Sequence, residues 1–199
     1  QLATAHDRYL QSCKSLLKLT VVEAGCGKPL SVKCFLADAK GHYYFPQEVA
    51  DGLAYGNEQN GQFYSFGESR IPLPAGAYCL KVLRGFEYVP IARNFELVGD
   101  GEQKIEIELE RWINLPEKGW FGGDEELQTI GHTEKAYDVL LNDPNADYAG
   151  QIFQAEGLNW IHLVNGTPPA PKKDNTFFLP GEGREVGSRL LGDVICLAK

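Results

Sequence analysis

Carboxylate and imidazole side chains gather toward the C-terminal end of the sequence. They are Asp124, His132, His162, Glu182, Glu185 and Asp193. Carboxylates with one or two imidazoles can hold a single divalent ion such as Zn, Mn or Fe, and a bound metal can activate water for hydrolysis. Several of these candidate ligands are predicted to lie at strand ends, which is where functional sites of α/β proteins usually form. Three alternatives stay open. Asp124 begins an acidic run that water can solvate, His132 suits a loop that approaches a helix, and His162 lies in an apolar segment that suits a hydrogen-bonded core histidine.

Residues 15–112 carry the pattern of an antiparallel β-sandwich. Segments 17–22 and 30–36 alternate in polarity around a Gly/Pro turn and predict a hairpin with one buried face. Residues 43–45 predict an aromatic strand, whereas the Gly/Asn-rich residues 46–61 predict a surface loop. The later predicted strands are 62–66, 77–84, the segment around Phe95 and Leu97, and a strand in which Ile105, Ile107 and Leu109 alternate with Glu106, Glu108 and Glu110.

The remaining segments predict a smaller α/β part. Residues 1–14 have a short helical pattern, and 113–123 form a Gly/Pro/aromatic connector. Within 124–199, helices are expected over 134–141 and 147–156, and buried strands over 158–164, 176–179 and 194–197. The predicted class is therefore mainly β with an α/β part.

The segment Leu73-Pro74-Ala75-Gly76-Ala77-Tyr78 resembles the turn that opens a core strand in carboxypeptidase-regulatory-like domains, which are prealbumin-like sandwiches. The residue types suit such a turn, since Pro fixes φ, Gly permits the bend, and a packed Tyr needs a partner for its hydroxyl. The resemblance implies a non-catalytic domain whose exposed aromatic rings bind sugars or proteins. The candidate rings are Tyr43, Tyr44, Tyr55 and Tyr64, with the sandwich core or rim as their alternative place.

The junction Leu109-Glu110-Arg111-Trp112 through Trp120-Phe121-Gly122-Gly123-Asp124 resembles the passage into the catalytic domain of CehA/McbA-type metallohydrolases of the polymerase-and-histidinol-phosphatase (PHP) superfamily. The segments 154–165, 179–182 and 190–194 also look like parts of that domain. In the family, Gly-Asp ends the first barrel strand and precedes a metal-binding His-x-His. Here Glu125-Glu126-Leu127 follows Asp124, and Gly192-Asp193 stands where the family commonly has Gly-His.

Composition narrows the classes of partner. The net charge of -8 and a pI near 5.0 leave no basic face for nucleic acid, and the apolar runs are too short to span a bilayer. The five Cys form no CxxC or Cys/His metal spacing and are expected as buried, reduced side chains. A Cys26–Cys79 or Cys34–Cys79 bridge is the alternative in an exported protein, and the compartment stays open.

Two functions follow from these observations. The first is an incomplete or degenerate relative of metal-dependent hydrolases acting on esters, amides or phosphoesters, with Asp124, His132, His162, Glu182 and Asp193 as metal ligands. The second is a non-catalytic module that binds a small molecule, carbohydrate or protein through Tyr43, Tyr44 and Tyr64. A true lack of His-x-His after Asp124 favours the second.

Overall fold

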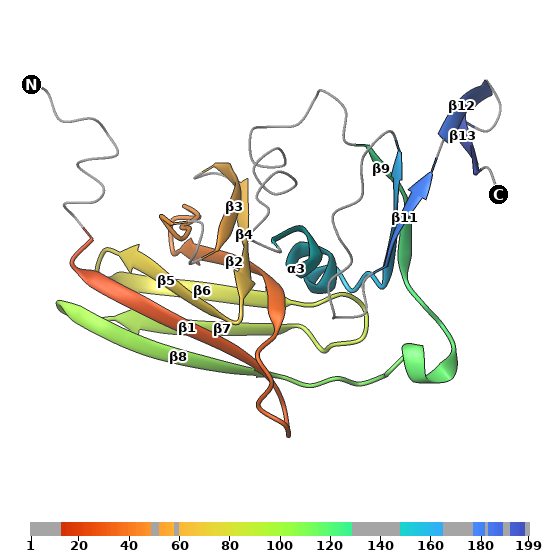
Figure 1. Ribbon diagram of the computed structural model, residues 1–199. Helices are drawn as coiled ribbons and strands as arrows, with labels where there is room; N and C mark the ends of the chain where they lie inside the picture. The colour runs from red at the N-terminus through yellow and green to blue at the C-terminus, as the bar shows by residue number, and fades with distance from the viewer. Residues whose placement is uncertain are drawn as a thin grey trace, which may run out of the picture. The chain divides into compact units, whose positions relative to one another are not determined.

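The computed structural model describes residues 13–48, 52–57, 60–128, 148–164, 177–181, 183–188 and 192–197 (Figure 1). The chain divides into two compact units, Gln1–Asn114 and Leu115–Lys199. No helix among the described residues is long and apolar enough to cross a membrane.

The first unit is a sandwich of two sheets (Figure 1). The larger sheet is antiparallel throughout, in the order β3 (Leu53–Asn57), β4 (Asn60–Phe66), β2 (Ser31–Asp38), β6 (Gly76–Leu83) and β7 (Ile91–Leu97). The smaller sheet has the order β5 (Glu68–Leu73), β1 (Ser15–Glu23) and β8 (Gly101–Leu109). Within it, β1 is antiparallel to β5 and parallel to β8. The mainly β class and the N-terminal sandwich are confirmed.

The core lies between the two sheets because every second residue along most of β1, β2, β5, β6 and β8 points inward. In β8, Ile105, Ile107 and Leu109 are at most 3% exposed, whereas the intervening glutamates face solvent. The inward residues of the other strands belong to the same cluster: Leu17, Leu19 and Val21 of β1, Val32, Cys34 and Leu36 of β2, and Leu80 and Val82 of β6. The polarity pattern therefore predicted the core face of these strands correctly.

The predicted hairpin between 17–22 and 30–36 is wrong, although its turn exists. Val22 bridges Pro29, and the Leu30 N–H donates to the Val21 carbonyl at 3.0 Å. Beyond that turn β1 and β2 enter different sheets. Each strand buries its apolar face by packing against the opposite sheet across the core, so the two strands need not pair with each other.

Two further local predictions differ from the structure. The expected loop 46–61 contains β3, whose Leu53 pairs with Tyr64 of β4. Its Gly and Asn residues have low strand propensity, which pairing with β4 overrides. The expected strand 43–45 is reduced to a single bridge between Tyr43 and Ala37.

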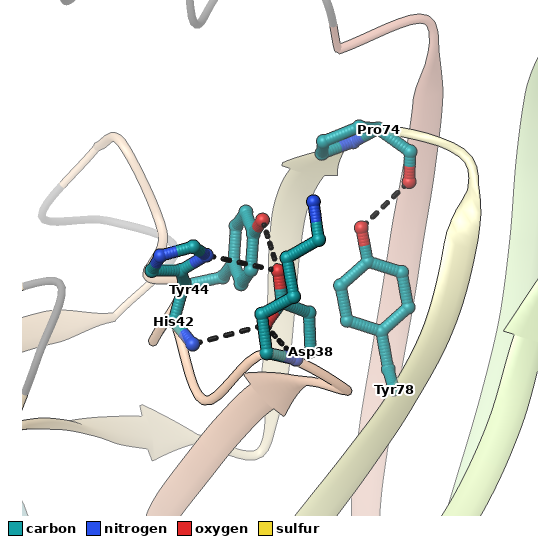
Figure 2. A network of polar contacts seen from close by, with 6 residues as sticks. Asp38, His42, Tyr44, Pro74 and Tyr78 are labelled. Carbon is teal, nitrogen blue, oxygen red and sulfur yellow. Dashed lines mark hydrogen bonds and ion pairs between the residues drawn. The ribbon is translucent and has the colours of Figure 1, made fainter.

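The turn that opens β6 agrees with the sequence prediction. Tyr78 is 4% exposed, and its hydroxyl donates a hydrogen bond of 2.7 Å to the Pro74 carbonyl (Figure 2). Its ring stacks on Phe95, with centroids 5.5 Å apart. The phenol thus holds together the turn where the chain passes from β5 in one sheet to β6 in the other.

Cys26, Cys34 and Cys79 form no disulfide bond. Cys34 is buried in the core as expected, and desolvation raises the pKa of its thiol. Cys26, in contrast, is exposed in a turn, and Cys79 is half-buried. The alternative bridges do not form: Cys34 lies on the core face of β2, whereas Cys79 alternates with the buried Tyr78 and Leu80 of β6 and faces away from the core.

The second unit contains a parallel sheet in the order β11 (Phe177–Gly181), β10 (Trp160–Val164) and β9 (Gly123–Gln128). Helix α3 (Tyr148–Ala155) lies between β9 and β10 in the chain. A separate antiparallel pair joins β12 (Gly183–Ser188) to β13 (Gly192–Leu197), and a short 3-10 helix covers Pro116–Lys118.

This arrangement confirms the helix expected over 147–156 and the strands expected over 158–164, 176–179 and 194–197. Strand β12 was not predicted. The family pattern places Gly-Asp at a strand end, but Gly123 and Asp124 open β9. The helix expected over 134–141 lies outside the described residues, as do residues 1–12 of the predicted N-terminal helix.

Candidate binding surface

Among the described residues of the first unit, four large apolar side chains face solvent, and one of them, Val98, lies in the turn between β7 and β8. Phe86 is 88% exposed, Trp112 62% and Val89 42%. We refer to Phe86, Val89 and Trp112 as the aromatic surface. Its chain segments follow β6 and β8, so it lies just beyond the ends of two well-packed strands.

Backbone hydrogen bonds join the two segments that carry the aromatic surface. Tyr88 bridges Arg111 in antiparallel fashion. The Trp112 N–H donates to the Glu87 carbonyl at 3.0 Å, and the Val89 N–H donates to the Glu110 carbonyl at 2.9 Å. The indole N–H of Trp112 also donates to the Phe86 carbonyl at 2.7 Å. These bonds fix the position of Trp112 although much of its surface is exposed.

A charged cluster supports this pairing from the buried side. Tyr88 is 7% exposed, and the guanidinium carbons of Arg84 and Arg111 lie 5.3 and 5.6 Å from its ring centroid. Such contacts are attractive because the face of an aromatic ring is electronegative. The Tyr88 hydroxyl donates to Glu23 Oε1 at 3.0 Å.

Each arginine of the cluster has an internal partner. Arg111 Nε donates to Glu87 Oε2 at 2.9 Å, and Arg84 donates to the Ser31 carbonyl. Partial burial alone would lower the pKa of Arg111, but the hydrogen bond to Glu87 raises it above its ordinary value. Burial raises the pKa of the Tyr88 phenol, which therefore stays protonated as a donor to Glu23.

A second polar network lies in the turn after β2 (Figure 2). Asp38 Oδ1 accepts the N–H groups of Lys40 at 2.8 Å and His42 at 2.9 Å. Its Oδ2 accepts the Tyr44 hydroxyl at 3.1 Å and lies 3.2 Å from His42 Nδ1. Desolvation alone would raise the pKa of Asp38, but these hydrogen bonds lower it below its ordinary value. Both carboxylate oxygens of Asp38 accept hydrogen bonds from residues of the turn itself, so the network stabilises the turn.

The three predicted binding tyrosines lie apart from the aromatic surface in the sequence. Tyr64 is 6% exposed, with Lys33 Nζ 5.7 Å from its ring centroid. Tyr44 packs against the core and meets Tyr78 edge-on at 5.4 Å between centroids. Tyr43 is half-buried. Ligand binding at these three residues stays a prediction, and the rings of Tyr44 and Tyr64 offer a ligand little free surface.

The predicted metal ligands fall in several places of the second unit. Asp124 lies in β9 and His162 in β10; these strands are neighbours, and their register pairs Asp124 with Ile161. Asp193 lies in β13, which belongs to the separate strand pair, as does Glu185 in β12. His132 and Glu182 lie outside the described residues.

The described part of the chain contains no group of three or more His, Cys, Asp or Glu side chains arranged to hold a metal. Asp124 and His162 lie on neighbouring strands, and two donors would not fix a catalytic ion. Binding of Zn, Mn or Fe by the predicted ligands therefore stays a prediction.

A depression of about 340 Å³ surrounds the turn between β7 and β8. It is lined by Ser15 and residues 97–104, and the Ser15 hydroxyl donates to the Gly99 carbonyl at 2.5 Å. Its walls are mostly exposed polar groups of one turn, which makes it a poorer candidate than the aromatic surface for a ligand held by apolar contact.

No family model matches the chain, and no curated protein matches it. Solved structures with local similarity include a Bacteroides uniformis protein described as carbohydrate-binding, at 11% identity over 48% of this chain and 41% of that chain, with a TM-score of 0.33. A group B streptococcus pilus 2b backbone protein shows 17% identity over 51% and 42%, at a TM-score of 0.38.

A minor pilin of Streptococcus agalactiae shows 18% identity over 50% of this chain and 45% of that chain, with a TM-score of 0.36. The chain thus spans less than half the length of each of these proteins. Similarity at this level gives no information about function.

Proposed function

We propose that the chain is a non-catalytic binding module, and that its sandwich binds a carbohydrate or protein ligand on the aromatic surface. The observation that carries the proposal is the combination of exposure and fixed position at Trp112. An aromatic ring that is 62% exposed and held by its own indole hydrogen bond can accept a ligand without first losing conformational freedom.

The energetics support a binding role. Covering a large apolar side chain is worth roughly 1.5–3 kcal/mol. Phe86 and Trp112 are neighbours in space, since the indole N–H of Trp112 donates to the Phe86 carbonyl. Tryptophan is among the residues that most often dominate binding energy at interfaces. Both ligand classes, carbohydrate and protein, can bind by stacking on such a ring.

One separate proposal follows from the resemblance to metallohydrolases. It is that any binding of a divalent ion involves Asp124 together with His132 or His162. In the register of β9 and β10, Asp124 lies opposite Ile161, one residue before His162. Coordination by one imidazole and few carboxylates would be labile and weak.

An array of oligosaccharides and peptides, probed with the full chain, tests the binding proposal. We expect capture of at least one probe by the wild type, loss of that capture in Trp112→Ala, and retention in Trp120→Ala. Trp120 is a matched control because it is 71% exposed but belongs to the second unit. Capture of no probe, or equal capture by Trp112→Ala, would contradict the proposal.

A further inference from the structure

Two arginines beside the aromatic surface have their charge neutralised by glutamates of the sandwich. Both nearby guanidinium groups, of Arg84 and Arg111, lie over the Tyr88 ring and donate hydrogen bonds inside the sandwich. Their positive charge is balanced there by Glu23 and Glu87, since Glu23 accepts from Tyr88 and Glu87 from Arg111. The cluster therefore has no net charge.

Negative charge, in contrast, is exposed. Glu108 and Glu110 both face solvent, at the end of β8 and just beyond it. Among the described residues neither carboxylate has an ion-pair partner. Glu110 lies opposite Val89, to which its carbonyl is bonded, and two residues before Trp112. The exposed charges nearest to Trp112 in the sequence are therefore negative. Two exposed cations lie farther along the same edge: Lys28, whose carbonyl is bonded to Glu23 opposite Leu109, and Arg93, which donates to the Glu106 carbonyl.

The indole of Trp112 has no donor left for a ligand. Its N–H is already bonded to the Phe86 carbonyl. A ligand can therefore contact the ring only through its carbon and π surface, and the π face of tryptophan attracts cations more strongly than that of other side chains. A cation beside Trp112 would also be attracted by Glu108 and Glu110.

We propose that the ligand of the aromatic surface is a basic peptide segment. One Lys or Arg side chain of the ligand stacks on Trp112, and further basic side chains face Glu108 and Glu110. This inference rests on the proposed binding function and selects one ligand class for it. A neutral oligosaccharide would stack on the same ring but gain nothing from the two carboxylates, and an anionic polymer would be repelled by them.

Fluorescence anisotropy of a labelled octa-arginine peptide, titrated with the full chain, tests the inference. The same peptide with citrulline in place of arginine is the neutral control, and labelled xylohexaose represents the neutral carbohydrates. We expect the arginine peptide to bind and the other two probes not to bind. Trp112→Ala should weaken binding about 30-fold or more, as for a central interface tryptophan.

The pair Glu108→Gln with Glu110→Gln should weaken arginine-peptide binding roughly tenfold at low salt and less at high salt. A matched pair, Glu96→Gln with Asp100→Asn, removes the same charge from exposed positions in β7 and its following turn. That control pair should leave binding nearly unchanged, which separates local attraction from the general effect of the net charge of -8.

Three results would overturn the basic-peptide inference: no binding of the arginine peptide, equal binding of the citrulline peptide, or equal weakening by the control pair. Xylohexaose binding that depends on Trp112 would overturn it while leaving the binding function standing. Arginine-peptide binding that Trp112→Ala does not change would count against the aromatic surface itself.

Discussion

The indole N–H of Trp112 donates a hydrogen bond of 2.7 Å to the carbonyl of Phe86, 26 residues earlier in the chain. This bond joins the segment after β6 to the segment after β8 and fixes an exposed ring in place. The same two segments are paired through Glu87 and Val89 with Trp112 and Glu110. An aromatic ring held in this way is pre-organised for a ligand, because little freedom remains to be lost on binding.

The hydroxyl of Tyr78 should contribute to the stability of the sandwich. Tyr78→Phe removes the bond to the Pro74 carbonyl, and we expect a loss of about 1 kcal/mol in the free energy of unfolding. Urea denaturation followed by circular dichroism measures it. Tyr43→Phe is the control, since Tyr43 is half-buried in a connecting segment; its change should stay within about 0.5 kcal/mol. Equal effects of the two substitutions would show that the Tyr78 bond adds no stability.

Asp38 should make stability depend on pH in the acid range. Its pKa is lowered in the folded protein, so its contribution is present above the ordinary pKa and is lost as pH falls through the lower folded value. Unfolding free energies at pH 7 and pH 2.5 should therefore differ less in Asp38→Asn than in the wild type. Asp100→Asn, at an exposed turn position, serves as the control. An unchanged pH dependence in Asp38→Asn would refute this role for the turn.

Gly123 has no room for a side chain. A Cβ at this position would stand 1.9 Å from Cε2 of Trp160. Gly123→Ala should destabilise the second unit by roughly 1–3 kcal/mol through overpacking. The effect should nearly vanish when Trp160→Ala is also present, because the ring that the methyl group meets is then gone. A double-mutant cycle by thermal unfolding measures this coupling, and strictly additive losses would exclude contact with Trp160 as the cause.

Metal binding, if the second unit has any, should depend on Asp124 with His132 or His162. Calorimetric titration of Zn and Mn into the wild type should give weak heats that fall in Asp124→Asn and in one of His132→Ala or His162→Ala. Identical isotherms in all four proteins would remove the metal from consideration.

We also expect no hydrolysis of phosphodiesters or aryl esters at an enzymatic rate, since the paired histidines of the family are missing after Asp124.

Local patterns predicted much of the fold. The alternation of Ile105, Ile107 and Leu109 with glutamates gave the buried face of β8, and the capped helix before Gly157 gave α3. Strand partners were not predictable in the same way. The turn before Pro29 suggested that β1 pairs with β2. The actual partners of β1 are β5 (Glu68–Leu73) and β8 (Gly101–Leu109), which lie far along the chain. Such long-range choices depend on how two sheets share one core.

The aromatic surface was missed although the sequence contained a signal for it. Outward positions of β8 fall on every second residue, at Glu106 and Glu108, and the same alternation continues through Glu110 to Trp112. Extending it by one step would have placed Trp112 on the solvent side. Residue type alone favours the tyrosines as binding residues, but it does not separate the buried Tyr64 from an exposed ring.

The most direct test of a binding role for the aromatic surface is fluorine NMR of the full chain labelled with 5-fluorotryptophan. The three Trp of the sequence give separate reporters, with Trp112 assigned through Trp112→Phe. During titration with a probe captured on the array, we expect a saturable shift of the Trp112 resonance and little change at Trp120 and Trp160. A Trp112 resonance that stays unmoved at saturation, while the probe remains bound, would contradict it.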